Sequence, residues 1–366
     1  MLKISDITAE LEKVAPPSLQ EDYDNSGLIT GEANTLVTNA LVCLDCTEAI
    51  IDEAIQANCN LVIAHHPIVF KGLKRLNGNN YVERTIIKAI RNQIAIYAIH
   101  TNLDNVLYQG VNSKIAEKLG LHNCRILDSK DGKLAKMVTF VPLSHADEVR
   151  NALFEAGTGK IGNYDACSFN TDGYGTYRGN ENSNAFAGKK GELHREAETR
   201  IETIFPLYLK SKVVSALLGT HPYEEVAYDI TLLQNTWKEA GSGMIGELQT
   251  AIPPEDFLEL LKRSMQPGVI KFTPFANSIK RVAICGGSGS FLLRNAIAAG
   301  ADAFVTSDFK YHDFFDAENK LMICDIGHYE SEQFTPELII EILRKKFVTF
   351  APVLAKTNTN PVNYYS

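Results

Sequence analysis

Three short apolar runs in this sequence each lead to histidine, and this recurrence constrains the fold more than any other feature. The runs span residues 61–64, 94–99 and 321–326, and the histidines that follow them are His65, His66, His100 and His328. Short apolar runs of this kind are typical of buried strands. In a parallel sheet, ligands bind beyond the carboxyl ends of the strands. We therefore expect these histidines to gather at one site.

The adjacent pair His65 and His66 places a condition on where its strand ends. Inside a strand, neighbouring side chains point to opposite faces and cannot share a site. We therefore predict that the strand ends at Ala64, before the turn that Pro67 forces, so that both imidazoles can point to one place.

Strand-like and helix-like segments alternate along the first third of the chain. Strands are predicted over residues 40–45, 61–64 and 94–99, and helices over 47–57, 82–92 and 110–119. The first of these helices is expected to have Thr47 as its N-cap. This alternation indicates an α/β fold with a mainly parallel sheet and crossover helices. The pattern breaks near residue 130 and resumes near 241, with strands over 280–285, 303–306 and 321–326 and a helix over 331–344. We expect a discontinuous core domain made of residues 1–129 and 236–366.

The segment between these parts, residues 130–235, follows a different pattern. Strands are predicted over 136–141, 164–170, 198–205 and 226–231, with helices over 145–155 and 207–217 and a hairpin loop over 173–191. The order βαββαβ is the ferredoxin-like arrangement. The sequence thus predicts an inserted ferredoxin-like α+β domain, and 366 residues suit a two-domain chain.

Charge and cysteine content narrow the class of protein. The net charge of −8 disfavours binding of nucleic acid through its phosphates. No apolar stretch reaches the ~18 residues needed to span a bilayer, and the charged start of the chain lacks an apolar signal core. Seven cysteines without framework spacing favour a reducing compartment. We expect a cytoplasmic protein without membrane contact.

Six side chains near the strand ends are of metal-binding types. They are His65, His66, His100, Asp104, His328 and Glu332. Imidazole and carboxylate together suit zinc, iron, manganese, nickel or cobalt and do not separate these metals. Because a catalytic zinc usually takes three protein ligands, the surplus favours two metals bridged by a carboxylate. Such a pair can activate water and hold a leaving oxygen. The alternative is that these are ordinary polar residues at loop starts.

Within this set we favour His65, His66, Asp104, His328 and Glu332 as the metal ligands. The remaining histidine, His100, is expected just outside them, where it would orient a ligand or act as a general acid or base.

Two further motifs carry weaker signals. Gly286–Gly289 follows a strand, and its amides could bind an anion, but it lacks the spacing of a phosphate loop, so a tight turn is favoured. Cys43 and Cys46 have redox spacing without a partner motif.

Other polar residues leave two interpretations open. Asp24 and Asp45 either line the site or serve turns and helix caps. In the insert, 221–225 carries His221 and two glutamates and is either a structural turn, which is favoured, or a second polar site.

These motifs together resemble those of the GTP cyclohydrolase 1 type 2 homologs, the Nif-three-like proteins. The matching pieces span residues 24–28, 64–68, 98–104, 286–289, 306–308 and 327–332, and they occur in the family's order. The resemblance implies two divalent metal ions per chain, with zinc favoured, held by His65, His66, Asp104, His328 and Glu332. It implies that Glu332 bridges them. It also implies a ring-shaped homohexamer and, for long members, an insert similar to the PII and CutA proteins.

Two functions follow as expectations. The first is a metal-dependent hydrolase of a small, nucleotide-like or phosphorylated substrate, with His100 moving protons. The second is a non-enzymatic metal-binding regulatory or scaffold ring whose insert senses a ligand or partner. The cyclohydrolase name itself predicts a guanine-reading pocket and triphosphate clamps, for which no residues stand out in the sequence.

Overall fold

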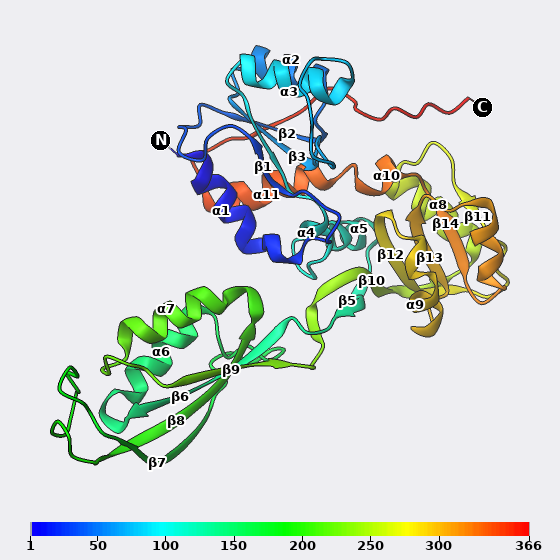
Figure 1. The fold of residues 1–366 in the computed structure, drawn as a ribbon. Coiled ribbons are helices and arrows are strands. Elements are labelled where there is room, and N and C mark those ends of the chain that lie inside the picture. The colour runs from blue at the N-terminus through cyan, green and yellow to red at the C-terminus, as the bar shows by residue number, and fades with distance from the viewer. Residues whose placement is uncertain (1, 366) are drawn as a thin grey trace. The chain divides into compact units, whose positions relative to one another are not determined.

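The computed structural model describes residues 2–365, which form two compact units. One unit comprises the chain up to residue 129 and from 239 onward, and the other comprises residues 130–238. Both units combine helices and strands (Figure 1). No helix within residues 2–365 has the length and apolar content needed to cross a membrane.

The first sheet of the larger unit has the strand order β1-β4-β3-β2-β15. Its strands are β1 (Gly27–Thr30), β4 (Ala95–Ala98), β3 (Leu61–His66), β2 (Ala40–Asp45) and β15 (Val353–Leu354). All neighbours are parallel except β1, which runs antiparallel to β4. The central strands are almost fully buried, as their apolar runs require.

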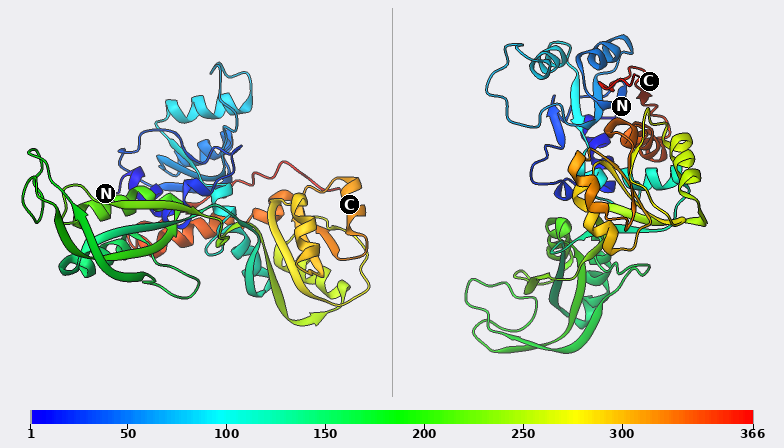
Figure 2. Two further views of the ribbon diagram at one scale, coloured as in Figure 1. Left: turned by 60° about the horizontal axis from the view of Figure 1, so that its bottom comes forward. Right: turned by 90° about the vertical axis from the view of Figure 1, so that its right-hand side faces the viewer.

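Helices cover both faces of this sheet. Figure 1 and Figure 2 show α2 (Glu48–Gln56) and α3 (Tyr81–Arg91) together on one face, and α1 (Ile4–Val14) and α11 (Thr335–Lys346) on the other. The predicted N-cap of α2 is confirmed, because the Thr47 side chain accepts a hydrogen bond from the Ile50 amide.

The prediction that the second strand ends at Ala64 is wrong. Strand β3 continues to His66, which lies opposite Asp45 on β2. On its other side, β3 pairs with β4 only as far as Ala64. His65 and His66 therefore lie beside a neighbouring strand on one side only. Although neighbouring side chains in a strand normally point to opposite faces, the rings of His65 and His66 lie 4.9 Å apart.

The second sheet has the order β11-β14-β13-β12-β10-β5. Its strands are β11 (Lys271–Phe272), β14 (Met322–Asp325), β13 (Ala303–Ser307), β12 (Ile279–Ser288), β10 (Trp237–Ile252) and β5 (His122–Lys130). The three strands β12, β13 and β14 are parallel. This half of the unit also contains three helices, α5 (Val111–Leu119), α8 (Pro254–Met265) and α9 (Leu293–Ala298).

Two predictions for this half are corrected. Gly286 and Gly287 do not form a turn after the strand but belong to β12, because Ser288 still pairs with Ser307 of β13. The helix predicted over 331–344 is two helices, α10 (His328–Glu332) and α11.

The smaller unit contains β6 (Leu134–Pro142), α6 (Ala146–Ala156), β7 (Phe169–Tyr177), β8 (His194–Pro206), α7 (Lys210–Thr220) and β9 (Tyr228–Leu233). Its sheet has the order β7-β8-β6-β9, and all neighbours are antiparallel. Helices α6 and α7 lie on one face of the sheet (Figure 1). Their apolar side chains belong to a core cluster with Met137, Ile201 and Phe205. The strand predicted over 164–170 is found at 169–177, because Gly173 and Gly175 continue the pairing with β8.

Candidate metal centre

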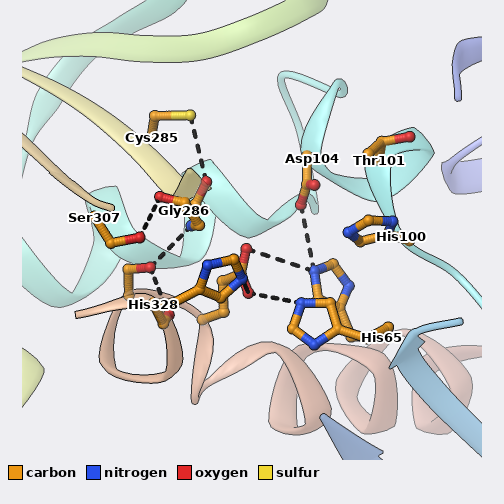
Figure 3. Close-up of polar contacts among 12 residues, drawn as sticks. His65, His100, Thr101, Asp104, Cys285, Gly286, Ser307 and His328 are labelled. Carbon is orange, nitrogen blue, oxygen red and sulfur yellow. Dashed lines mark hydrogen bonds and ion pairs between the residues drawn. The ribbon is translucent and has the colours of Figure 1, made fainter. Parts of the chain in front are cut away.

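The carboxyl ends of strands from both sheets of the larger unit meet at one place. His65 and His66 end β3, and His100 lies between β4 and the short helix α4 (Thr101–Asp104), which carries Asp104. Helix α10, just beyond β14, carries His328 and Glu332 one helical turn apart. Figure 3 shows His65, His100, Asp104 and His328 around a common space.

His65 is fully buried, and its ring is held by the backbone. Nδ1 donates to the Ile99 carbonyl oxygen at 2.8 Å, which leaves the lone pair of Nε2 pointing away from that bond. Burial lowers the pKa of His65 to about 4, so the imidazole is neutral at physiological pH. A neutral imidazole with its Nε2 lone pair free is the form that binds metal ions.

His66 and His328 are each oriented by an aspartate. Nδ1 of His66 lies 2.8 Å from Oδ1 of Asp45, and Nδ1 of His328 lies 2.6 Å from Oδ2 of Asp308. Burial opposes their charge, but these carboxylates and Glu332 raise the pKa of His66 to about 10 and that of His328 to about 11. A proton and a cation therefore compete for their Nε2 atoms.

His100 has the same kind of support. Its Nδ1 lies 2.8 Å from Oδ1 of Asp24, whose other oxygen accepts hydrogen bonds from Ser26 and from the amide and hydroxyl of Thr101. Burial disfavours the charge on Asp24, but the hydrogen bond from His100 and that from Thr101 keep its pKa below the usual range. The ring of His100 stands 5.2 Å from those of both His65 and His66.

Two carboxylates complete the cluster. Oε2 of Glu332 lies 3.0 Å from Nε2 of His66 and 3.3 Å from Nε2 of His328. Nε2 of His65 is 3.6 Å from Oδ1 of Asp104 and 3.8 Å from Oε1 of Glu332. Burial and the negative charge of Glu332 raise the pKa of Asp104, whereas the three surrounding imidazoles hold the pKa of Glu332 down against its burial.

The donor set fits a divalent cation. Among the buried side-chain atoms of residues 2–365, Nε2 of His65 and Oδ1 of Asp104 are two of only four without a hydrogen-bond partner, and they face each other. Three triads have ligand atoms within 4.8 Å of one another: His65 with His66 and His100, His66 with His328 and Glu332, and His65 with Asp104 and Glu332. Buried polar atoms are normally satisfied, and a cation between these two atoms would satisfy both.

The glycines of β12 form the wall of this site instead of an anion-binding turn. Gly287 has φ +61°, and a Cβ atom there would collide with Oε1 of Glu332. Its carbonyl accepts hydrogen bonds from Thr306 and Ser307, and its amide donates to Ser331. Gly287 thus allows Glu332 to approach the backbone closely.

The structure brings together all six residues predicted for the metal site. It also shows where the residues of the weaker motifs lie. Asp24 and Asp45 lie directly behind two of the histidines. Cys43 and Cys46 are buried, and burial raises the pKa of both thiols, so they stay protonated. His221 belongs to the smaller unit, where its Nε2 lies 3.0 Å from the Phe140 carbonyl oxygen. Sequence reasoning gave no role to Asp308, although it follows directly the strand β13 at the same edge.

Comparison with known proteins extends over the whole chain. A profile of the family described as Duf34/NIF3 (NGG1p interacting factor 3) matches residues 2–361. A Halalkalibacterium halodurans protein named GTP cyclohydrolase 1 type 2 homolog is 38% identical over 359 residues, which is 96% of each chain. A Bacillus subtilis protein of the same name is 36% identical over 360 residues, again 96% of each chain.

Solved structures show the same extent of similarity. A Bacillus cereus protein related to NIF3 superimposes with a TM-score of 0.89 at 37% identity, covering 100% of this chain and 99% of that one. A Staphylococcus aureus protein gives a TM-score of 0.77 at 31% identity, with 100% and 99% covered. The similarity therefore includes both units of the chain.

Proposed function

This chain belongs to the Duf34/NIF3 family, which confirms the resemblance drawn from its motifs, and from that premise we propose that it is a metal-dependent hydrolase. Its substrate in this proposal is a small nucleotide-like or phosphorylated molecule. The relatives' shared name, GTP cyclohydrolase 1 type 2 homolog, points to the same chemical class.

One observation carries the proposal. All four clustered histidines have Nδ1 within 2.8 Å of an oxygen acceptor, which for three of them is an aspartate. This arrangement orients Nε2 of each ring and makes it a better ligand, as in many metal sites of proteins. Structural histidines need no such common orientation around two buried carboxylates.

In this proposal His65, His66, Asp104, His328 and Glu332 would hold two divalent cations, with zinc favoured. Glu332 would be shared between them, because its Oε1 faces His65 while its Oε2 faces His66 and His328. When bound, such cations activate water and polarise a phosphoryl or carbonyl oxygen. His100 takes no metal in this scheme. The hydrogen bond to Asp24 keeps a proton on Nδ1 of His100. Nε2 of His100 is therefore free to accept a proton from the attacking water and return it to the leaving group.

The loop after β3 supports an anionic substrate with a planar part. Phe70 is half exposed, and its ring stands 5.6 Å from that of His100. Three exposed basic residues follow Phe70 in this loop, and they form no ion pair within residues 2–365. They are Lys71, Lys74 and Arg75. An aromatic face beside the centre and free positive charges in the same loop suit a base and a phosphate group.

The first experiment is metal content per chain by plasma mass spectrometry, on wild type, His66→Ala and His122→Ala. His122 is an exposed histidine on β5 and serves as the matched control. We expect about two transition-metal ions in wild type and in His122→Ala, and a clear loss in His66→Ala. Wild-type protein that stays metal-free after reconstitution would contradict the site.

The second experiment tests catalysis on the metal-loaded protein. A panel of nucleotides and phosphate esters is followed by chromatography, with Glu332→Gln as the inactive variant and Glu337→Gln, a half-exposed glutamate of α11, as its control. Turnover lost only in Glu332→Gln supports the hydrolase. A loaded protein that converts nothing would favour a regulatory metal-binding ring instead.

We also propose that residues 130–238 are a ferredoxin-like module of the PII and CutA kind and that six chains form a ring. The strand order β9-β6-β8-β7 with two helices on one face supports the first part. Light scattering coupled to gel filtration tests the second, since a mass other than six chains of 40.4 kDa contradicts it.

A further inference from the structure

The smaller unit contains a cavity of about 640 Å³ that is separate from the metal centre. Its wall includes Phe140 of β6 and Glu198 and Arg200 of β8. On β8, residues 201 and 205 pack under the helices, so by the alternation of a strand Glu198 and Arg200 point to the opposite face. The volume lies within the range of small-molecule sites in proteins.

Two glycines create the hollow. Gly173 and Gly175 of β7 lie opposite Glu198 and Glu196, and therefore on the same face of the sheet. A Cβ atom at Gly173 would meet nothing within 4 Å, whereas one at Gly175 would collide with the carboxylate of Glu198. The missing side chains thus leave space above the sheet and let the Glu198 carboxylate lie flat against β7.

Aromatic rings surround this space. Tyr177 ends β7, Phe186 comes from the segment that joins β7 to β8, and Tyr223 follows α7. The ring of Tyr223 is 5.8 Å from that of Tyr177 and 5.9 Å from that of Phe186. With Phe140 they present four ring faces or edges to the cavity.

A carboxylate without a cation lies among these rings. Glu198 is only 7% exposed, and among the described residues its side chain accepts one hydrogen bond, from the Tyr223 hydroxyl to Oε1 at 2.7 Å. It takes part in no ion pair within the described residues, and the nearby Arg200 is paired with Glu202 at 2.7 Å. Buried carboxylates are normally paired with a positive group.

The cavity as a whole is acidic. Asp172, Glu198, Glu224 and Glu225 line it, against Arg178 and Arg200. A metal ion is a poor candidate for the missing charge, since no triad of metal-binding side chains within residues 2–365 includes Glu198. An alkylammonium group satisfies both features, because its charge pairs with a carboxylate and its carbon atoms pack against aromatic rings.

We propose that this cavity binds a small aliphatic amine, with Glu198 pairing with the ammonium group and Tyr177, Phe186 and Tyr223 enclosing the adjacent carbon chain. The carboxylates Glu224 and Glu225 at the wall suit a second ammonium group along the same chain. The proposal concerns the inserted unit alone and is independent of the hydrolase.

Calorimetric titration of the full-length protein with spermidine tests it, with 1,8-octanediol as an uncharged chain of similar length. We expect saturable binding of spermidine and none of the diol. Glu198→Gln should weaken spermidine binding at least tenfold. Glu155→Gln, the same charge change on the exposed side of α6, should leave it unchanged.

A second variant probes the space instead of the charge. Gly173→Val places a side chain in the open part of the cavity at ordinary backbone angles, so it should weaken binding as strongly with the carboxylate intact. Wild-type protein without saturable heat, equal binding in Glu155→Gln and Glu198→Gln, or full binding by Gly173→Val would each overturn the proposal.

Discussion

Oδ1 of Asp45 lies 2.8 Å from Nδ1 of His66, and the other oxygen of the same carboxylate accepts a hydrogen bond from the Thr359 hydroxyl at 2.7 Å. A residue near the end of the chain thus fixes the aspartate that orients a histidine of β3. The geometry of the proposed metal centre therefore depends on residues that hydrogen-bond to the ligands, and on residues that hydrogen-bond to those in turn.

Replacing Asp45 should weaken metal binding without removing a ligand. In Asp45→Asn the amide no longer favours a proton on Nδ1 of His66, so we expect about a 10- to 100-fold loss of affinity. Competition with a chromogenic chelator measures it. Asp52→Asn, which breaks only a surface pair with Lys88, is the control, and equal affinities of the two variants would contradict the role of Asp45.

Gly287→Ala should disturb the centre through Glu332. The variant strains a positive φ, at a cost of about 1–2 kcal/mol, and its Cβ displaces the Glu332 carboxylate. Gly120→Ala has the same strain at φ +67° with nothing within 4 Å of the added atom. Thermal unfolding should show destabilisation of both variants, and plasma mass spectrometry should show metal loss only in Gly287→Ala.

Removing the positive charges after Phe70 should affect substrate capture more than turnover. For the triple variant Lys71→Ala, Lys74→Ala, Arg75→Ala we expect about a tenfold lower kcat/KM for an anionic substrate, chiefly through KM, and a weaker dependence on salt. Metal content should not change. The exposed Arg344, Lys345 and Lys346 of α11 provide a control triple variant, and an equal effect there would argue against a local role.

Attachment of the C-terminal segment should depend on pH through Glu53. Its carboxylate accepts hydrogen bonds from the amides of Lys356 and Thr357 and from the Thr357 hydroxyl. Burial opposes this charge, but the hydrogen bonds with Thr357 and Lys356 lower the pKa of Glu53 below its usual 4.5. The folded state therefore favours the ionised form, so the stabilisation is complete above pH 4.5 and is lost as the pH falls through the lowered value.

Hydrogen exchange of residues 353–360 across pH 7 to 3, corrected for intrinsic rates, checks this prediction. Protection should fall at acidic pH in wild type and be lower and less pH-dependent in Glu53→Gln. Constant protection down to pH 3 would show that other contacts hold the segment.

The long periodic elements and the ligand types could be predicted from the sequence because local patterns specify them. Strand β2 and the cap of α2 are found where expected. Strands β1, β5, β10, β11 and β15 were not predicted, because they are short or partly polar and owe their pairing to distant segments. The same applies to the boundary of β3, which depends on the strand beside it.

The orienting groups of the site were harder to predict than the ligands. The Ile99 carbonyl has no side-chain signature, and Asp308 and Gly287 acquire their roles only when β12 and β13 bring them beside α10. Asp24 and Asp45 remained ambiguous for the same reason, since a capping aspartate and a histidine-orienting aspartate are indistinguishable until the partner is placed.

The separation of the site residues along the chain has a consequence for biosynthesis. The ribosome synthesises the first half of the site early, with His65, His66, His100 and Asp104. The whole inserted unit follows, and only then are His328, Glu332 and Thr359 added. A nascent chain therefore carries only half of the proposed metal centre until His328 and Glu332 have been synthesised. Correct loading of the proposed centre requires both halves, and premature capture of a metal by the first half would be a route to misassembly.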